Sequence, residues 1–179
     1  MSHSLDHIMK PSSVAVIGAS TKPHTIGSDL MKRLIEFGFK GRIYPVNPKG
    51  GMIEGLQAYP SVLDIEGPVD MAVIVVNSKF VLSTIDQCHE KGVKGLVVIS
   101  AGFKESGKEG AEMEAQLYER VKKYGMRCVG PNCLGVVNTH PDVRMDACFA
   151  ESLPVRGDIG FVSQSGALGG GILNILQDL

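Results

Sequence analysis

A run of small and hydroxyl residues follows the first apolar segment of this 179-residue sequence. Such residues, placed just before a helix, offer backbone N–H groups and a favourable helix dipole to a phosphate group. The run matches neither GxGxxG nor GxxxxGK[ST], so it signals neither standard dinucleotide binding nor P-loop binding. A purely structural interpretation stays open, in which the glycines only permit a tight turn and close packing. The run covers residues 18–27 and includes Gly18, Ala19, Ser20, Thr21, Lys22, Ile26 and Gly27.

The end of the second apolar segment carries Asn47 and Lys49 and has no acidic residue. Proteins that bind NAD usually place an acidic residue there to hold the ribose hydroxyl groups. A lysine suits a phosphorylated ribose instead, as in NADP or coenzyme A. The alternative is that Lys49 is an ordinary solvated loop lysine.

Three later segments also end in small or polar residues that could hydrogen-bond a ligand: Val76, Asn77 and Ser78; Ser100, Ala101 and Gly102; Asn132 and Cys133. Each could also be simple turn and cap chemistry. Cys133 is interpreted as a small buried thiol rather than a nucleophile, because no histidine stands in an evident partnering motif. No catalytic base is assigned.

The elements that must position these residues alternate between strands and helices. Continuous apolar runs predict strands buried on both faces, and periodic apolar positions predict helices. This alternation predicts an α/β fold, a Rossmann-like, doubly wound, mainly parallel sheet with helices on both faces. The expected strands are 14–17, 43–46, 71–76, 96–99 and 126–129, and the expected helices are 27–37, 79–91 and 108–124.

Two stretches are less regular. Residues 48–68 are expected to form a loop with a short helical turn near 61–65, and a long irregular passage follows Asn132. Residues 158–179 predict a new strand, a Gly/Ser turn and the start of a helix. We therefore expect two domains, 1–150 and the truncated beginning of a second at 151–179, in a fragment of a longer protein.

Composition excludes several classes. With a net charge of −1, the sequence lacks the excess of basic residues that is typical of a nucleic-acid binder. No apolar run approaches the length of a membrane-spanning helix. The first ten residues lack the apolar core of a signal peptide, and the four cysteines form no CxxC pair, so we expect reduced thiols, no metal site and a cytoplasmic location.

Five colinear blocks carry a family resemblance: VAVIGAST at 14–21, YPVNPKGG at 44–51, VVISAGFKE at 97–105, GPNCLG at 130–135 and FVSQSGALG at 161–169. Together they resemble the CoA-binding region of the NDP-forming acyl-CoA synthetases, closest to acetate–CoA ligase (ADP-forming) and related to the succinyl-CoA synthetase α subunit. The same region also begins protein lysine acetyltransferases that carry a GNAT domain.

The resemblance implies that the strand-end residues named above bind CoA or acyl-CoA, with Lys49 on a CoA phosphate and Asn132–Cys133 toward the thiol. It also implies that ATP, ADP and Mg²⁺ belong to an ATP-grasp domain or subunit outside this chain. The phosphohistidine of these ligases would lie outside it as well, so no catalytic residue is expected here. By the same resemblance, a turn that helps to hold that histidine comprises Ser163, Gln164, Ser165 and Gly166.

Other settings for the same domain remain open. It could be a CoA-binding regulatory domain of an acetyltransferase, a free-standing CoA-binding protein or, more remotely, an NADP-dependent oxidoreductase. Succinyl relatives carry an acidic residue in the loop after the fourth strand, whereas this chain has Ser100–Gly102, which favours the acetate-type branch. Apolar residues such as Phe161 and Leu168 could support homo-oligomers.

Overall fold

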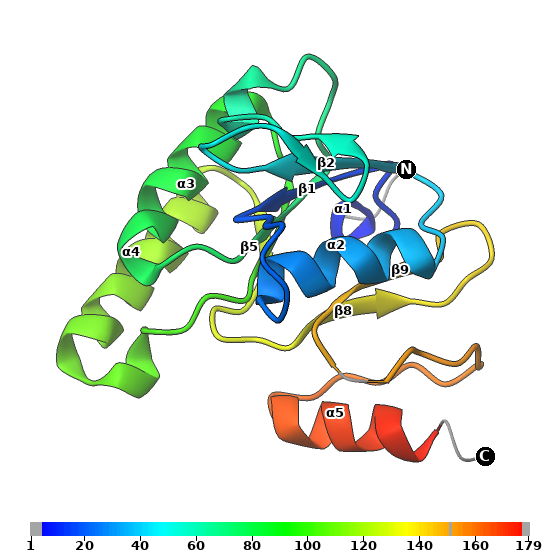
Figure 1. The fold of residues 1–179 in the computed structure, drawn as a ribbon. Coiled ribbons are helices and arrows are strands. Elements are labelled where there is room, and N and C mark those ends of the chain that lie inside the picture. Colours follow the sequence, from blue (N-terminus) through cyan, green and yellow to red (C-terminus); the bar gives the residue numbers. More distant parts are fainter. Residues whose placement is uncertain (1–4, 151, 177–179) are drawn as a thin grey trace.

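A five-stranded parallel sheet forms the centre of the computed structural model, which describes residues 5–150 and 152–176 (Figure 1). Its strands lie in the order β2-β1-β5-β6-β7, so the chain leaves β1 first toward one edge and then returns past β1 to build the other. This confirms the predicted doubly wound α/β fold. The strands are β1 (Ser13–Ile17), β2 (Arg42–Val46), β5 (Met71–Ile74), β6 (Gly95–Val98) and β7 (Arg127–Val129).

Helices cover both faces of this sheet (Figure 1). Helix α2 (Ile26–Glu36) packs on one face, together with the short α1 (Asp6–Met9). Helices α3 (Ser78–Lys91) and α4 (Lys108–Lys123) pack on the other. Alternate strand residues enter the two cores, because successive side chains of a strand point to opposite faces. In β1, Ala15 faces the α3–α4 side and Val16 faces α2.

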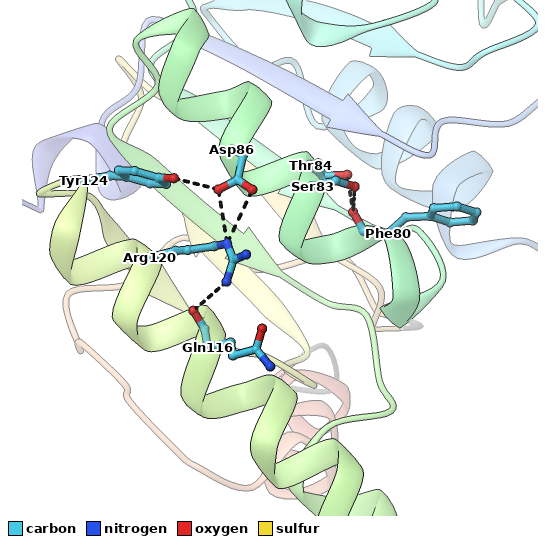
Figure 2. Close-up of polar contacts among 7 residues, drawn as sticks. All are labelled: Phe80, Ser83, Thr84, Asp86, Gln116, Arg120 and Tyr124. Carbon is cyan, nitrogen blue, oxygen red and sulfur yellow. Dashed lines mark hydrogen bonds and ion pairs between the residues drawn. The ribbon is translucent and has the colours of Figure 1, made fainter.

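A polar cluster joins α3 to α4 on the outer side of the molecule (Figure 2). The Asp86 carboxylate accepts hydrogen bonds from Arg120 Nε at 3.2 Å and from the Tyr124 hydroxyl at 2.8 Å. One turn earlier in α3, the hydroxyls of Ser83 and Thr84 both donate to the Phe80 carbonyl. The Asp86 contacts cross from α3 to α4 and tie the two helices together, whereas the Ser83 and Thr84 bonds stay within α3.

Two hairpins occupy stretches that the sequence predicted to be irregular. Strands β3 (Met52–Ile53) and β4 (Leu56–Gln57) pair within the connection to β5, just before the predicted helical turn, which is a 3₁₀ turn at Val62–Asp64. Strands β8 (Gly135–Asn138) and β9 (Met145–Cys148) pair after β7, and β9 packs against α2.

The strand predicted within residues 158–163 is wrong. These residues are irregular, and Ile159 and Val162 are 93% and 97% exposed. An isolated strand has no partner for its backbone hydrogen bonds, and no neighbouring strand among the described residues supplies one. The predicted helix does form, as α5 (Gly166–Ile175). Over the two described ranges, no helix combines the length and apolar character that a membrane crossing requires.

Candidate functional site

The predicted strand-end residues gather along one edge of the sheet, because all five strands are parallel. The chain direction diverges between β1 and β5, which are neighbours but lead into helices on opposite faces. Open α/β sheets bind ligands at such a switch point, outside the carboxyl ends of the strands. Backbone hydrogen bonds continue one residue beyond the strand ends. The Gly18 amide donates to the Val46 carbonyl at 3.0 Å, and the Val75 amide donates to the Ile17 carbonyl at 2.9 Å.

Gly18 and Gly27 bring the start of α2 directly against the end of β1. A Cβ atom added to Gly27 would lie 2.1 Å from the Gly18 carbonyl oxygen, and one added to Gly18 would lie 2.9 Å from the Val75 carbonyl oxygen. Gly18 also has a φ of 101°, which L side chains rarely adopt. The two glycines therefore permit the tight turn and the close helix–strand packing, and this packing places the first turn of α2 at the switch point.

The loop between β1 and α2 is ordered by its own hydroxyl groups. Ser20 Oγ accepts from the Lys22 amide at 3.0 Å, and Thr25 Oγ1 donates to the Lys22 carbonyl at 2.8 Å. Thr25 then caps α2 by accepting from the Ser28 amide. The amides of Ile26 and Gly27 precede the first intrahelical bonds, so the helix itself does not use them. Ile26 is exposed and Gly27 is buried. Thr21 and Lys22 are exposed beside them.

Asn47 braces the loop from the neighbouring strand end. Its Nδ2 donates to the Ala19 carbonyl at 2.7 Å, and its Oδ1 accepts from the Lys49 amide at 2.9 Å. The Asn47 side chain therefore links the loop after β1 to the loop after β2 through both its NH₂ group and its carbonyl oxygen. The exposed Lys49 has no ion-pair partner within residues 5–150 and 152–176, so its ammonium group can meet a ligand phosphate.

The ends of β5 and β6 touch each other through small side chains. The buried Ser100 hydroxyl donates to the Val76 carbonyl at 2.6 Å. Gly102 has a φ of 102°, and a Cβ atom there would lie 2.7 Å from Ser78 Oγ. Asn77 caps α3 by accepting from the Lys79 amide. Ala101 is exposed between these contacts.

Glu105 is a residue of this edge that the sequence analysis missed. Its carboxylate accepts from the amides of Gly102 at 2.6 Å and Phe103 at 3.1 Å. Burial acts to raise the pKa of Glu105, but these backbone hydrogen bonds outweigh it and the pKa lies below its ordinary value. The signal was an acidic residue three positions after a glycine, which is the spacing of a local carboxylate–backbone turn.

Asn132 and Cys133 complete the edge after β7. The Asn132 amide donates to the Ser100 carbonyl at 3.1 Å, and its side chain is exposed. The Cys133 thiol donates to the Val98 carbonyl at 3.3 Å, and burial raises its pKa to about 11. A thiol with this pKa is protonated at neutral pH, which agrees with a packing role and not with a nucleophile.

The turn expected to belong to a second domain precedes α5 and is ordered by its own serines. Ser165 caps α5 by accepting from the Leu168 amide at 3.3 Å, and its own amide donates to Ser163 Oγ at 3.0 Å. Gln164 is exposed between them. Gly166 faces Leu134, the residue after Cys133, since a Cβ added to Gly166 would lie 3.7 Å from the Leu134 Cβ.

Fold and edge together define a Rossmann-like α/β domain, a class whose ligands usually bind at the topological switch point. The model of the CoA binding domain family matches residues 12–139, and the chain belongs to that family.

The relatives are longer proteins. The chain is 51% identical over 170 residues to the acetate–CoA ligase [ADP-forming] I subunit alpha of Pyrococcus furiosus, covering 93% of this chain and 36% of the relative. It is 43% identical to the 4-hydroxybutyrate–CoA ligase [ADP-forming] of Nitrosopumilus maritimus, covering 90% of this chain and 23% of that protein. The chain thus spans little more than a third of the first relative and less of the second.

A solved structure repeats the fold. The dinucleotide-forming acetyl-coenzyme A synthetase 1 of Ca. Korarchaeum cryptofilum, in complex with phosphate and ADP, superposes with a TM-score of 0.89 at 44% identity. The match covers 96% of this chain and 36% of that one.

Proposed function

We propose that this chain holds CoA along the carboxyl edge of its sheet, as the CoA-binding portion of an NDP-forming acyl-CoA synthetase. The observation that carries the proposal is the contact of Gly18 with Gly27, which sets the α2 amides beside the strand end that bears Lys49. Unused amides and an unpaired ammonium group are the donors that a phosphorylated ribose and a diphosphate require.

The donor set divides along the edge in the order of the strands. Gly18–Lys22, Ile26–Gly27 and Lys49 receive the phosphate groups, while Asn47 keeps their loops together. Val76–Ser78 flank the middle of the ligand. Ser100–Gly102, Asn132 and Cys133 lie toward its thiol end, where small side chains leave room for a narrow pantetheine chain.

The whole protein would interconvert acid, ATP and CoA with acyl-CoA, ADP and phosphate. The names of the ligase relatives support this activity and favour it over an acetyltransferase setting, a free-standing CoA-binding protein or an oxidoreductase. The division into a CoA-binding domain at 1–150 and a second domain from 151 belongs to this proposal. So do the phosphate role of Ser163–Gly166, homo-oligomers, a cytoplasmic location, and an ATP-grasp partner that supplies ATP, ADP and Mg²⁺.

Calorimetric titration of the chain with CoA, dephospho-CoA and NADP tests the ligand assignment. We expect CoA to bind, and we expect removal of its 3′-phosphate to weaken binding by about tenfold, since one charged contact is lost. Lys49→Ala should weaken the binding of CoA by a similar factor and should change the binding of dephospho-CoA little.

Lys122→Ala is the matched control, because Lys122 is an exposed lysine in the last turn of α4, away from the carboxyl edge. It should leave CoA affinity unchanged. Binding of NADP in preference to CoA would overturn the proposal, as would equal losses for Lys49→Ala and Lys122→Ala.

A further inference from the structure

Arg33 is a buried charged residue that the proposed CoA site does not use. It lies in the second half of α2 and is 9% exposed. One guanidinium nitrogen, Nη2, lies 2.8 Å from Asp146 Oδ2 in strand β9 and donates to the Ser152 carbonyl at 2.6 Å. A single side chain of α2 therefore contacts both the second hairpin and the chain that leaves it.

Asp146 is fully buried, so its carboxylate needs compensating partners. Besides the ion pair with Arg33, its Oδ1 accepts from the Cys148 thiol at 3.1 Å. The ion pair joins the carboxylate to α2, and the thiol holds its other oxygen within β9. This arrangement holds Arg33 in one geometry, because a guanidinium group presents its donors in a rigid plane.

The contact set continues from Ser152 to α5. The Ser152 hydroxyl donates to Asn174 Oδ1 in the last turn of that helix. At the other end of α5, Gly166 and Gly169 face Leu134, with added Cβ atoms 3.7 and 3.4 Å from its side chain. The start of the helix thus lies beside Leu134, and its end is held by a polar contact.

We propose that Arg33 fixes the position of α5 relative to α2. The polar chain of Asp146, Arg33, Ser152 and Asn174 joins α2, β9 and α5 through consecutive contacts. Because α5 begins at the Ser163–Gly166 turn, the same chain sets where that turn lies relative to the carboxyl edge. The phosphate role of the turn rests on the proposed function, whereas the positional role of Arg33 does not.

Hydrogen exchange of the α5 amides measures this role directly. A helix of ten residues is marginally stable in water without tertiary contacts, so its release should expose its amides to exchange. In Arg33→Met we expect exchange in α5 to accelerate by about tenfold, with β5 and β6 unchanged. Arg33→Lys should recover part of the protection, since it keeps the charge but loses the planar fork.

Two further variants separate this role from general destabilisation. Ser152→Ala keeps the carbonyl that Arg33 contacts but loses the bond to Asn174, so α5 should again exchange faster. Arg144→Met is the matched control. Arg144 is an exposed arginine just before β9 whose Nε donates to the Phe37 carbonyl at the end of α2 at 2.8 Å, without reaching Ser152 or α5.

The outcomes are distinct. Unchanged α5 exchange in a folded Arg33→Met protein would overturn the proposal, as would equal acceleration in the central strands. If Arg33→Met does not fold, Arg33→Lys and Ser152→Ala decide, and unchanged α5 exchange in both would overturn it. CoA titration of the same proteins is expected to change by less than about twofold. Failure of the unaltered chain to bind CoA would contradict the proposed function. The exchange test of the positional role of Arg33 would still be valid.

Discussion

Gly27 packs so closely on Gly18 that a Cβ atom added to Gly27 would stand 2.1 Å from the Gly18 carbonyl oxygen. The contact is between backbone atoms, so no side chain can rotate away to make room. Gly18 is itself confined, because its own Cβ position is 2.9 Å from the Val75 carbonyl oxygen. The start of α2, the end of β1 and the end of β5 are therefore fixed to one another at the point where the ligand is expected.

Gly27→Ala should damage stability and ligand binding together. The added methyl group must displace backbone, which we expect to lower the free energy of unfolding by about 3 kcal/mol. Because the α2 amides move with it, CoA affinity should fall by at least about tenfold. Urea denaturation and calorimetry measure the two effects. Gly171→Ala is the control, since an added Cβ there meets nothing within 4 Å. Unchanged stability and CoA affinity in Gly27→Ala would contradict the prediction.

Ser100→Ala should loosen the junction between β5 and β6. Its buried hydroxyl donates to the Val76 carbonyl at 2.6 Å, and removal leaves that carbonyl without this donor. We expect a loss of about 1–2 kcal/mol in urea denaturation. Ser83→Ala removes a comparable bond to the Phe80 carbonyl on the exposed side of α3 and should cost less than about 0.5 kcal/mol (Figure 2). Equal costs would show that burial does not decide the effect.

The sequence was sufficient for the elements that bury continuous apolar runs. All five sheet strands and three helices were predicted within a few residues, because strands such as β5 and β6 are buried along their whole length. Prediction from the sequence failed for strands whose formation depends on a neighbouring strand. Strands β3 and β4 have two residues each, too few for any periodicity, and the false strand at 158–163 has apolar residues without a neighbour.

The buried ion pair shows a second limit of sequence reasoning. Strand β9 reads Met-Asp-Ala-Cys and is buried at every position, although an acidic residue inside a strand usually indicates exposure. The compensating charge, Arg33, lies in a helix more than a hundred residues earlier. The strand-end residues could be predicted, because parallel topology alone collects them at one edge. The packing role of Asn47 could not, since its bond to Ala19 depends on the exact loop path.

Tyr124 provides a spectroscopic test of the α3–α4 cluster (Figure 2). The hydrogen bond to Asp86 is the main cause that raises the pKa of Tyr124 above its ordinary value of 10.0, while Arg120 opposes the shift. Asp86→Ala should therefore lower the phenol pKa, and Arg120→Met should raise it further. Ultraviolet titration, read as the difference from Tyr124→Phe, follows the phenolate. Shifts of the same sign in the two variants would refute the assignment.

The cysteine thiols should make the protein less stable as the pH rises above about 9. Burial raises the pKa of Cys88 to about 12 and that of Cys133 to about 11, from an ordinary value of 9.0. Between the ordinary and the raised values the unfolded chain releases the protons that the folded chain keeps. Each such thiol then lowers the free energy of unfolding by about 1.4 kcal/mol per pH unit. Cys88→Ala should make the free energy of unfolding, measured by urea denaturation, fall less steeply with pH. An unchanged dependence on pH would contradict this prediction.

Alkylation of the native protein should begin at Cys133 and should be blocked by CoA. At about pH 8 a thiol with a pKa of about 11 is roughly a hundredfold less ionised than one at 9.0, so iodoacetamide should react slowly. Cys133 lies half-buried after β7. Cys128 is also half-buried, but burial raises its pKa further, to about 12, and Cys88 and Cys148 are fully buried. Mass spectrometry should therefore find Cys133 modified first. Saturating CoA should slow that site alone if the pantetheine arm lies beside it. Unaltered modification with CoA bound would remove Cys133 from the thiol end of the site while leaving the phosphate end at Lys49 untouched.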